Sequence, residues 1–509
     1  MMNQENYHNP IICADYSDPD IVRVGDDFFM VSSSFNHMPA LPILHSTDLI
    51  NWKIINHVFA ALPLPGYERY QPGKGVWAPS LRWHDDKLWV FFSTPDEGIF
   101  MCNTRDPWGE WSAPHCLRRA SGWIDPCPFW DSNGQAWLVH AFAHSRSGIK
   151  HKLQLLPMSP DGTSLSGEGV IIYDGSCDQP TLEGPKIYKR GEWYYIFAPA
   201  GGVETGWETV LRAREMTGPW EARNVLFQGD TAINGPHQGG WVELKNGECW
   251  FVHFQDAHLY GRIVHLQPMT WGDDGWPRIG VPLGEDGAGQ PVSQWSRPAG
   301  LPFTPQYQLQ TSDDFTAGRP DRQWQWQANP DPSWLMQAEQ GLHLRCVPLE
   351  TIDGEKTLYY APHLLLQKFP AFAFTATTAL TLNSTRNGDS GGLIVYGERY
   401  ASLSIEYCAA GYRLVWLYGW MSDAGILRET RQVVATLPDG QCECQVVVKP
   451  GGICHFFYRT DQHDWQAAPG TFVAGKGKWV GAKVGVFAAS SADTAGEGYC
   501  KFPSFTVTV

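Results

Sequence analysis

Short runs of Val, Ile, Phe, Tyr and Trp alternate with polar turns along most of the chain. Gly, Asp and Asn separate these runs, as in a chain of β-strands joined by tight turns. Long stretches with helical periodicity are nearly absent. The hydrophobic and polar pattern therefore predicts an all-β protein.

One hairpin pattern recurs in the first three hundred residues: a short strand, a polar turn, and a second strand that begins with aromatics. The copies are DIVRVGDDFFMV from Asp20, SLRWHDDKLWVFF from Ser80, CPFWDSNGQAWLVH from Cys127, KIYKRGEWYYIF from Lys186 and WVELKNGECWFVH from Trp241. The steps between equivalent aromatics are 61, 48, 57 and 56 residues, taking Phe28, Trp89, Trp137, Tyr194 and Trp250 as equivalent. Such a period matches one four-stranded blade per repeat, so residues 1–300 are predicted to form a five-bladed β-propeller.

The residues just before each hairpin carry the candidate chemistry. They are Asp18-Pro19, Ala78-Pro79, Asp125-Pro126, Glu183-Gly184-Pro185 and Gly235-Pro236-His237. The innermost strands of a propeller start at one end of its central channel, so we expect these residues to converge on one pocket. A single Asp-Pro is commonly a turn. Three acids at equivalent positions of a repeat, Asp18, Asp125 and Glu183, indicate general acid–base chemistry instead.

Residues Val292 to Thr311 form a proline-rich stretch without a repeating pattern, which is typical of a linker. Alternating strands such as FAFTATTALTL and CQVVVKPGGICHFFY follow from Ser312 onward. A two-sheet β-sandwich is the natural package for such strands. Residues 301–509 are therefore predicted to form a second, sandwich domain.

Composition narrows the classes of function. The 509 residues are 43% hydrophobic and 18% charged, enough for two or three folded domains. A net charge of −15 argues against nucleic acid and anionic membranes as partners. The start, MMNQENYHNP, has neither a basic nor an apolar segment, and no apolar run approaches the roughly 20 residues of a membrane span. We therefore expect a cytoplasmic protein.

The cysteines and aromatics are less decisive. Twelve cysteines are scattered from Cys13 to Cys500 without a CxxC pair, and Cys442-Glu443-Cys444 has no second ligand pair nearby. This spacing favours small buried side chains in a reducing compartment over disulfides or zinc. Twenty-four tryptophans suit either a packed β core or a surface that stacks on sugars, and composition does not choose between them.

Several motifs in order resemble glycoside hydrolase family 43. NPIICADYSDPDIVRVGDDFFMVSSSF, LPILHSTDLINW and GVWAPSL resemble the family's opening, and WIDPCPFW, TLEGPKIYK, GPHQGGWV and GRIVHLQPMTWGDDGWP continue in its order. The resemblance covers the propeller and, more weakly, the rest. The two-domain plan is most similar to the β-xylosidases and α-L-arabinofuranosidases. The resemblance implies a concanavalin A-like sandwich, and the segment DDF from Asp313 resembles the start of that domain.

The resemblance implies an inverting hydrolase in which Asp18 is the general base that activates water. Glu183 would be the general acid that protonates the leaving oxygen. Asp125 would orient Glu183 and raise its pKa through a neighbouring negative charge. Inversion needs the two reacting carboxyl groups roughly 6.5–9.5 Å apart, a gap that blades one and four can provide.

Further residues are assigned by the same resemblance. Arg262 matches an arginine that binds substrate beside the base and stays protonated. Phe35 and Trp77 match aromatics that line the pocket of the terminal sugar, although an aromatic in a β chain is more often core. His237 matches a histidine that faces the channel, in a structural role or near a bound calcium ion (Ca2+). No organic cofactor is implied, since acid, base and water suffice.

Trp479 is the candidate for an aromatic from the second domain that closes the pocket, with core packing as the alternative. The presence of that domain favours exo action by resemblance. Two departures from the family pattern, Ile124 before Asp125 and Ser80 after Ala78-Pro79, leave the sugar preference open.

The sequence thus predicts an exo-acting β-1,4-xylosidase on xylo-oligosaccharides, with α-L-arabinofuranosyl substrates also open. A fructan- or sucrose-cleaving propeller hydrolase is the first alternative, since Arg105-Asp106-Pro107 and Glu248-Cys249 resemble its motifs but fall away from the blade starts. A non-catalytic sugar-binding propeller is the second, although three convergent carboxylates would cost it energy. Whether the chain forms a homo-oligomer is left open.

Overall fold

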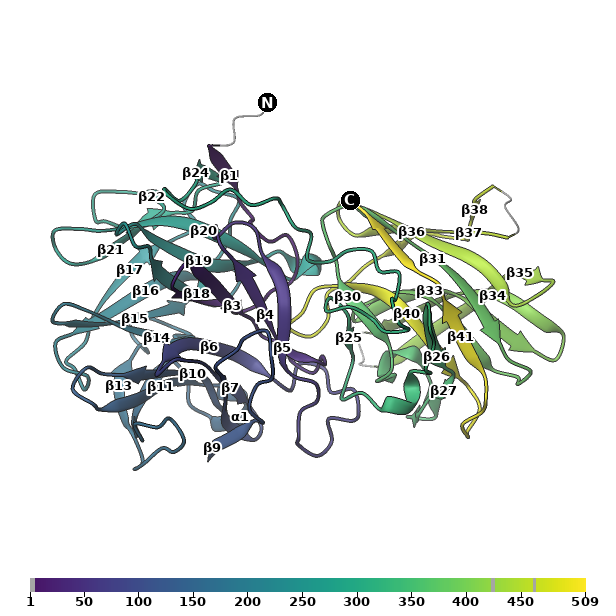
Figure 1. The fold of residues 1–509 in the computed structure, drawn as a ribbon, viewed down its shortest axis with the longest axis horizontal. Helices are drawn as coiled ribbons and strands as arrows, with labels where there is room; N and C mark the ends of the chain where they lie inside the picture. Colours follow the sequence, from purple (N-terminus) through teal and green to yellow (C-terminus); the bar gives the residue numbers. More distant parts are fainter. Residues whose placement is uncertain (1–4, 423–425, 461–463) are drawn as a thin grey trace.

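The computed structural model describes residues 5–422, 426–460 and 464–509. Two β-rich bodies lie side by side, a propeller coloured purple to teal and a sandwich coloured green to yellow (Figure 1). Helices are short within those ranges: α1 (His144–Ser147) and the 3₁₀ helices η1 (His258–Tyr260), η2 (Pro332–Trp334) and η3 (Leu358–Tyr360). None of them is long and apolar enough to cross a membrane.

Five sheets form the propeller, each with a blade of four antiparallel strands in chain order, and the fourth sheet has two further strands. The first two blades are β2 (Asp20–Val24), β3 (Asp27–Val31), β4 (Ala40–Ser46), β5 (Lys53–Phe59), and β6 (Trp77–His84), β7 (Lys87–Thr94), β8 (Gly98–Thr104), β9 (His115–Arg119). The third is β10 (Trp123–Trp130), β11 (Ala136–Phe142), β12 (Lys152–Met158), β13 (Val170–Asp174). The last two are β14 (Lys186–Arg190), β15 (Trp193–Ala200), β16 (Trp207–Ala213), β17 (Glu221–Leu226), and β18 (His237–Glu243), β19 (Cys249–Asp256), β20 (Arg262–Trp271), β21 (Pro277–Ile279).

The predicted repeat and the five-bladed propeller are confirmed. The five aromatics taken as equivalent all lie in the second strands of their blades, β3, β7, β11, β15 and β19. Four of them are buried and Trp137 is partly buried, because these strands pack against neighbouring blades. First strands of neighbouring blades contact each other, β2 with β6 and β6 with β10 among them, which places them innermost.

Short strands connect the start and the end of the propeller sequence. β22 (Val281–Pro282) and β23 (Gly289–Gln290) extend the fourth blade, and β1 (Asn6–His8) pairs with β24 (Gln294–Ser296). Ile12 also bridges to Val264 of β20. The stretch predicted as a linker therefore includes the short strand β24.

Two eight-stranded sheets form the sandwich. The first contains β25 (Gln325–Trp326), β27 (Val347–Pro348), β30 (Leu365–Lys368), β32 (Asp389–Tyr396), β33 (Arg399–Cys408), β34 (Gly411–Met421), β35 (Leu427–Leu437) and β40 (Lys483–Ser490). The second contains β26 (Leu342–Arg345), β31 (Phe374–Asn383), β36 (Gln441–Lys449), β37 (Ile453–Arg459), β38 (Gln466–Ala467), β39 (Phe472–Val473), β41 (Tyr499–Phe502) and β42 (Phe505–Thr508). A separate hairpin consists of β28 (Thr351–Ile352) and β29 (Glu355–Lys356). All twelve cysteines are free, and eight of them are buried.

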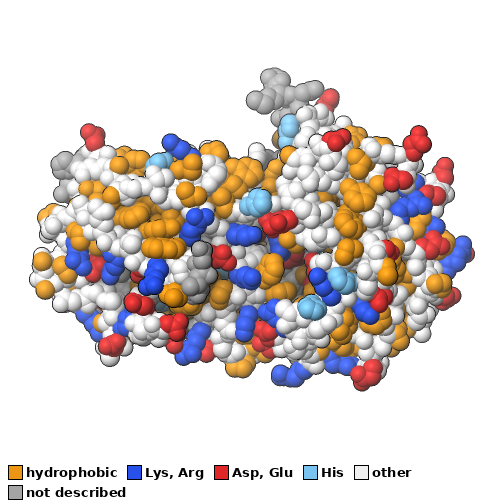
Figure 2. All heavy atoms as spheres, turned by 180° about the vertical axis from the view of Figure 1, so that it is seen from behind, with side chains coloured by type: hydrophobic (Ala, Val, Ile, Leu, Met, Phe, Trp, Pro, Cys, Tyr) orange, Lys and Arg blue, Asp and Glu red, His pale blue; other side chains and the backbone are white. Residues whose placement is uncertain are grey.

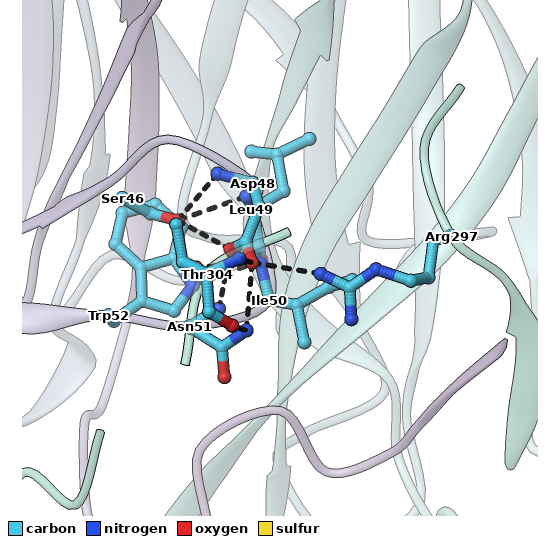
Figure 3. Close-up of polar contacts among 8 residues, drawn as sticks. All are labelled: Ser46, Asp48, Leu49, Ile50, Asn51, Trp52, Arg297 and Thr304. Carbon is cyan, nitrogen blue, oxygen red and sulfur yellow. Dashed lines mark hydrogen bonds and ion pairs between the residues drawn. The ribbon is translucent and has the colours of Figure 1, made fainter. Parts of the chain in front are cut away.

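The connection between the domains is anchored on the first blade by the buried carboxylate of Asp48, between β4 and β5 (Figure 3). Asp48 accepts hydrogen bonds from the Thr304 hydroxyl at 2.5 Å and from the Arg297 guanidinium at 2.9 Å. Its other donors are the Ser46 hydroxyl, the Asn51 side-chain amide and the backbone N–H groups of Ile50, Asn51 and Thr304. Burial alone would raise the pKa of Asp48, but the hydrogen bonds from Thr304 and Asn51 hold it below its usual value.

A second attachment joins the fifth blade to the sandwich. Tyr260, in η1, packs into the hydrophobic core of the sandwich. Its hydroxyl accepts hydrogen bonds from the Gly451 and Gly452 N–H groups and donates to the Phe372 carbonyl. The loop between β19 and β20 is therefore fixed between the domains, directly before Arg262.

Candidate active site

All five blades begin with one residue in the left-handed backbone region, where non-glycine residues are strained. These residues are Asp18 (φ 55°), Ala78 (22°), Asp125 (57°), Gly184 (57°) and Gln238 (40°). Pro or Gly follows each of them. Asp18 and Asp125 are thus equivalent, but Glu183 lies one residue earlier, at the position of His237 in the fifth blade. The predicted equivalence of the three acids is wrong by one residue for Glu183.

A cavity of about 110 Å³ lies where the blade starts converge. It is lined by all the residues that the sequence singled out, Asp18, Phe35, Trp77, Asp125, Glu183, His237, Arg262 and Trp479. Ala78, Ile124, Val203 and Gln238 complete the wall. Ile124 therefore contacts the cavity, as the departure from the family pattern suggested, whereas Ser80 accepts a hydrogen bond from Lys186 outside its lining.

Asp18 is 6% exposed and is surrounded by hydrogen-bond donors. The Ser17 and Ser33 hydroxyls donate to Oδ2 at 2.7 and 2.5 Å. Arg262 Nη1 lies 3.4 Å from Oδ1 and donates to the Ser17 hydroxyl at 2.7 Å. These contacts favour an ionised carboxylate, the form required of a general base.

Sequence reasoning missed both serines. Ser17 directly precedes Asp18, and that adjacency is a signal that could have identified it. Ser33 belongs to the run Ser32-Ser33-Ser34, and the sequence does not show which of the three hydroxyls turns toward Asp18. In the structure, Ser33 also accepts a hydrogen bond from the Ala78 N–H at 2.8 Å, which links the first two blades.

Glu183 is paired with the buried His237. His237 Nε2 lies 2.9 Å from Glu183 Oε1. The Glu183 side chain remains 26% exposed, so one part of it faces the open side of the cavity. A carboxyl group held on one side and open on the other can deliver a proton to a bound molecule.

Asp125 is only 3% exposed and accepts a hydrogen bond from the Gly184 N–H at 2.8 Å, next to Glu183. Burial first, then the charges of Glu183 and Asp18, raise the pKa of Asp125 to about 8. The raised pKa thus falls on the residue expected to be ionised, because Asp125 is more deeply buried than Glu183.

Three aromatic rings line one side of the cavity. Phe35 and Trp77 meet edge to face at 6.2 Å between ring centroids, and Trp77 and Trp479 do so at 6.3 Å. Trp479 comes from the sandwich segment between β39 and β40, and the Arg262 guanidinium lies 5.9 Å from its ring. Trp479 is 42% exposed, so it lies at the cavity and not in the core of the sandwich.

His237 does not fit a direct calcium ligand. Ca2+ prefers six to eight oxygen ligands. Nε2 of His237 is engaged by Glu183, while Nδ1 is buried without a hydrogen-bond partner. Across the described ranges, no three His, Cys, Asp or Glu side chains are grouped so that they could hold a metal ion.

The motifs of the fructan-cleaving alternative lie elsewhere. Arg105-Asp106-Pro107 forms a turn between β8 and β9, where Asp106 accepts a hydrogen bond from the Trp108 N–H. Glu248 lies in the hairpin turn before β19 and accepts from the Ala299 N–H. Neither motif lines the cavity, and this alternative is not favoured.

Comparison with known proteins gives consistent matches in both domains. The family model described as glycosyl hydrolases family 43 matches residues 7–277. The model described as the beta xylosidase C-terminal concanavalin A-like domain matches residues 312–508. The sandwich is therefore of the concanavalin A-like type.

Individual proteins align along most of the chain. A Xylanibacter ruminicola protein named "Putative beta-xylosidase" is 36% identical over 483 residues, covering 94% of this chain and 85% of its own. The "Non-reducing end alpha-L-arabinofuranosidase BoGH43B" of Bacteroides ovatus is 29% identical over 427 residues, covering 78% and 74%. The solved xylan beta-1,4-xylosidase of Bacillus halodurans C-125 shares the fold, with a TM-score of 0.85, 24% identity and coverage of 99% and 100%.

Proposed function

Because the chain belongs to glycosyl hydrolases family 43, we propose that it is an exo-acting, inverting enzyme that releases terminal xylose from xylo-oligosaccharides. The names of the Xylanibacter ruminicola and Bacteroides ovatus relatives support a β-xylosidase, with α-L-arabinofuranosides as a second substrate class. The observation that carries the proposal is one cavity lined by Asp18, Asp125 and Glu183 together.

In this mechanism Asp18 removes a proton from the attacking water. Ser17, Ser33 and Arg262 donate to or lie beside its carboxylate and stabilise the ionised form. The water attacks the anomeric carbon from the face opposite the leaving group, which inverts the configuration.

Glu183 protonates the glycosidic oxygen as the bond to the anomeric carbon breaks. His237 holds one carboxyl oxygen of Glu183, and Asp125 holds the adjacent Gly184 N–H. After each turnover Asp18 releases to solvent the proton that it took from the water, and Glu183, on the open side of the cavity, takes one up, which restores both groups.

The wall of the cavity supports exo action. Phe35, Trp77 and Trp479 stand together on one side of it, and Trp479 comes from the second domain. The aromatic rings present apolar faces and edges to the sugar's C–H groups, while the carboxylates and Arg262 bind its hydroxyls.

Hydrolysis of aryl β-xylopyranoside, aryl α-arabinofuranoside and xylobiose tests the proposal. We expect turnover of the β-xyloside and xylobiose, and loss of at least about 100-fold in kcat with Glu183→Ala on xylobiose, whose leaving group needs a proton. Absence of turnover on all three substrates, with binding retained, would support the non-catalytic sugar-binding alternative.

A further inference from the structure

Asp15 has no role in the mechanism above, yet its carboxylate joins two walls of the cavity. It lies three residues before Asp18 and is 4% exposed. Its Oδ1 accepts a hydrogen bond from the Arg262 backbone N–H at 2.8 Å. Its Oδ2 accepts one from the Gly481 backbone N–H at 2.9 Å. One side chain of the propeller thus holds a strand of the fifth blade and a segment of the sandwich.

Both partners of Asp15 stand next to groups that face the sugar. Arg262 begins β20, and its guanidinium contacts Asp18 and Ser17. Gly481 lies two residues after Trp479, the sandwich residue at the cavity. A shift of either backbone segment would therefore move a group that contacts substrate or the general base.

The chain is closely packed where Asp15 contacts the segments of Arg262 and Gly481. A Cβ atom on Gly261 would lie 2.3 Å from Asp15 Cγ, and one on Gly481 would lie 2.6 Å from the Tyr260 carbonyl carbon. The Ala482 N–H also donates to the Leu259 carbonyl at 2.7 Å. The Asp15 side chain leaves no room for a Cβ at Gly261, whose φ of +77° also favours glycine, and the backbone of Tyr260 leaves none at Gly481.

Two buried lysines of the sandwich respond to the charge of Asp15. Burial lowers the pKa of Lys368 to about 7 and that of Lys483 to about 8, and the charge of Asp15 opposes both shifts. The Lys368 ammonium lies 3.7 Å from the ring centroid of Tyr16, the residue after Asp15.

We propose that Asp15 is a positioning residue for the hydrolysis, which fixes Arg262 and the Trp479 segment relative to each other through one carboxylate. The inference rests on the proposed function, because both groups are assigned to the sugar pocket there. The sandwich domain thereby contributes to catalysis through the placement of Arg262 as well as through the Trp479 ring.

Asp15→Asn in the full-length chain tests this. Asparagine preserves the size, but its single carbonyl oxygen replaces two acceptors, so one of the two N–H groups loses its partner. We expect kcat/KM for xylobiose to fall about 10- to 100-fold, with KM raised because Arg262 and Trp479 both contact the sugar. The acid limb of the pH–kcat/KM profile should move to higher pH, because Arg262 no longer lies beside the general base.

Asp48→Asn is the matched control. Asp48 is also a buried, multiply hydrogen-bonded aspartate at the contact between the propeller and the connecting segment, but it does not line the cavity. A lower thermal midpoint with unchanged KM and pH profile is expected for it. The same result for Asp15→Asn would show a structural role only and overturn the proposal.

Two further measurements separate the possible failures. Should Asp15→Asn not fold, Gly481→Ala perturbs the same joint with Asp15 intact, and an unchanged KM for that variant would overturn the proposal. Turnover by the wild type decides the proposed function independently. If the wild type is active and the Asp15→Asn variant is unaffected, only the positioning role is wrong. If the wild type is inactive, the hydrolase assignment on which that role rests is wrong.

Discussion

At the scale of single residues, the three acids of the cavity differ in what surrounds them. Asp18 has two hydroxyl donors and an arginine, Glu183 has one histidine and an open side, and Asp125 is nearly sealed. Charged carboxylates are stabilised by donors and destabilised by burial. These surroundings fit a base at Asp18 and a proton donor at Glu183, while burial raises the pKa of Asp125.

Asp125→Asn should change the pH dependence of stability. The pKa of Asp125 is raised to about 8 in the folded protein, against about 3.9 in an unfolded chain. The folded state therefore binds more protons between these values, and its stability from this group falls as pH rises from about 4 to 8. The free energy of unfolding of the variant should therefore fall less than that of the wild type as pH rises. The difference is a few kcal/mol at most (about 1.4 kcal/mol per pKa unit). Denaturant unfolding at pH 5 and pH 8 measures it, and identical slopes for both proteins would contradict the assignment.

The residues of the site were predictable where sequence repeats or motifs fixed them. Every predicted site residue lies at the cavity. Asp18, Asp125 and Glu183 do so because the blade starts of a propeller converge, whereas Phe35, Arg262 and Trp479 lie elsewhere in the chain and were assigned by resemblance. The one-residue offset of Glu183 has a signal in the sequence, because Pro19 and Pro126 directly follow Asp18 and Asp125, whereas Gly184 separates Glu183 from Pro185. The hydroxyl of Ser33 and the carboxylate of Asp15 reach their partners only through tertiary packing, which leaves no spacing signal.

At the scale of elements, a turn between two strands can bind a segment that is far away in the sequence. The segment between β4 and β5 binds Arg297 and Thr304 of the connecting stretch through Asp48 (Figure 3). The period of the aromatic hairpins predicted the blades. It could not predict β22, β23 and β24, because strands of two or three residues form only when a partner edge is already present.

Asp48→Asn should destabilise the fold without affecting catalysis. Losing the charge weakens the bonds from Thr304 and Arg297, and we expect about 2–4 kcal/mol lower stability at pH 7, as when one partner of a buried ion pair is removed. The pKa of Asp48 is lowered in the folded protein, so its contribution is present above pH about 4 and is lost as pH falls further. Unfolding by denaturant at pH 7 and pH 3 measures both. A variant as stable as the wild type at pH 7 would contradict the anchoring role.

At the scale of the whole molecule, the two domains share one cavity. The sandwich supplies Trp479, and the propeller supplies the acids. The sequence predicted two domains and a candidate aromatic, but the position of Trp479 depends on contacts at Tyr260 and Asp15 that join the bodies. On the face seen in Figure 2, acidic and basic side chains are interspersed. The cytoplasmic localisation and the oligomeric state remain predictions from the sequence.

Trp479→Ala should open the cavity toward the sandwich. We expect KM for xylobiose to rise about 5- to 10-fold, the loss of roughly 1–1.5 kcal/mol of aromatic contact, with a smaller change in kcat. The fold should persist, because the ring is 42% exposed. Steady-state kinetics on xylobiose and xylotriose measure the effect, and unchanged KM values would exclude Trp479 from the sugar site.

The stereochemistry of the first product tests the central mechanism most directly. Proton NMR during hydrolysis of an aryl β-xylopyranoside resolves the anomers of xylose before they equilibrate. Because Asp18 is proposed to activate a water opposite the leaving group that Glu183 protonates, the account predicts α-xylose as the first product. The appearance of β-xylose first would mean retention through a covalent intermediate, and the roles assigned to Asp18 and Glu183 would be wrong.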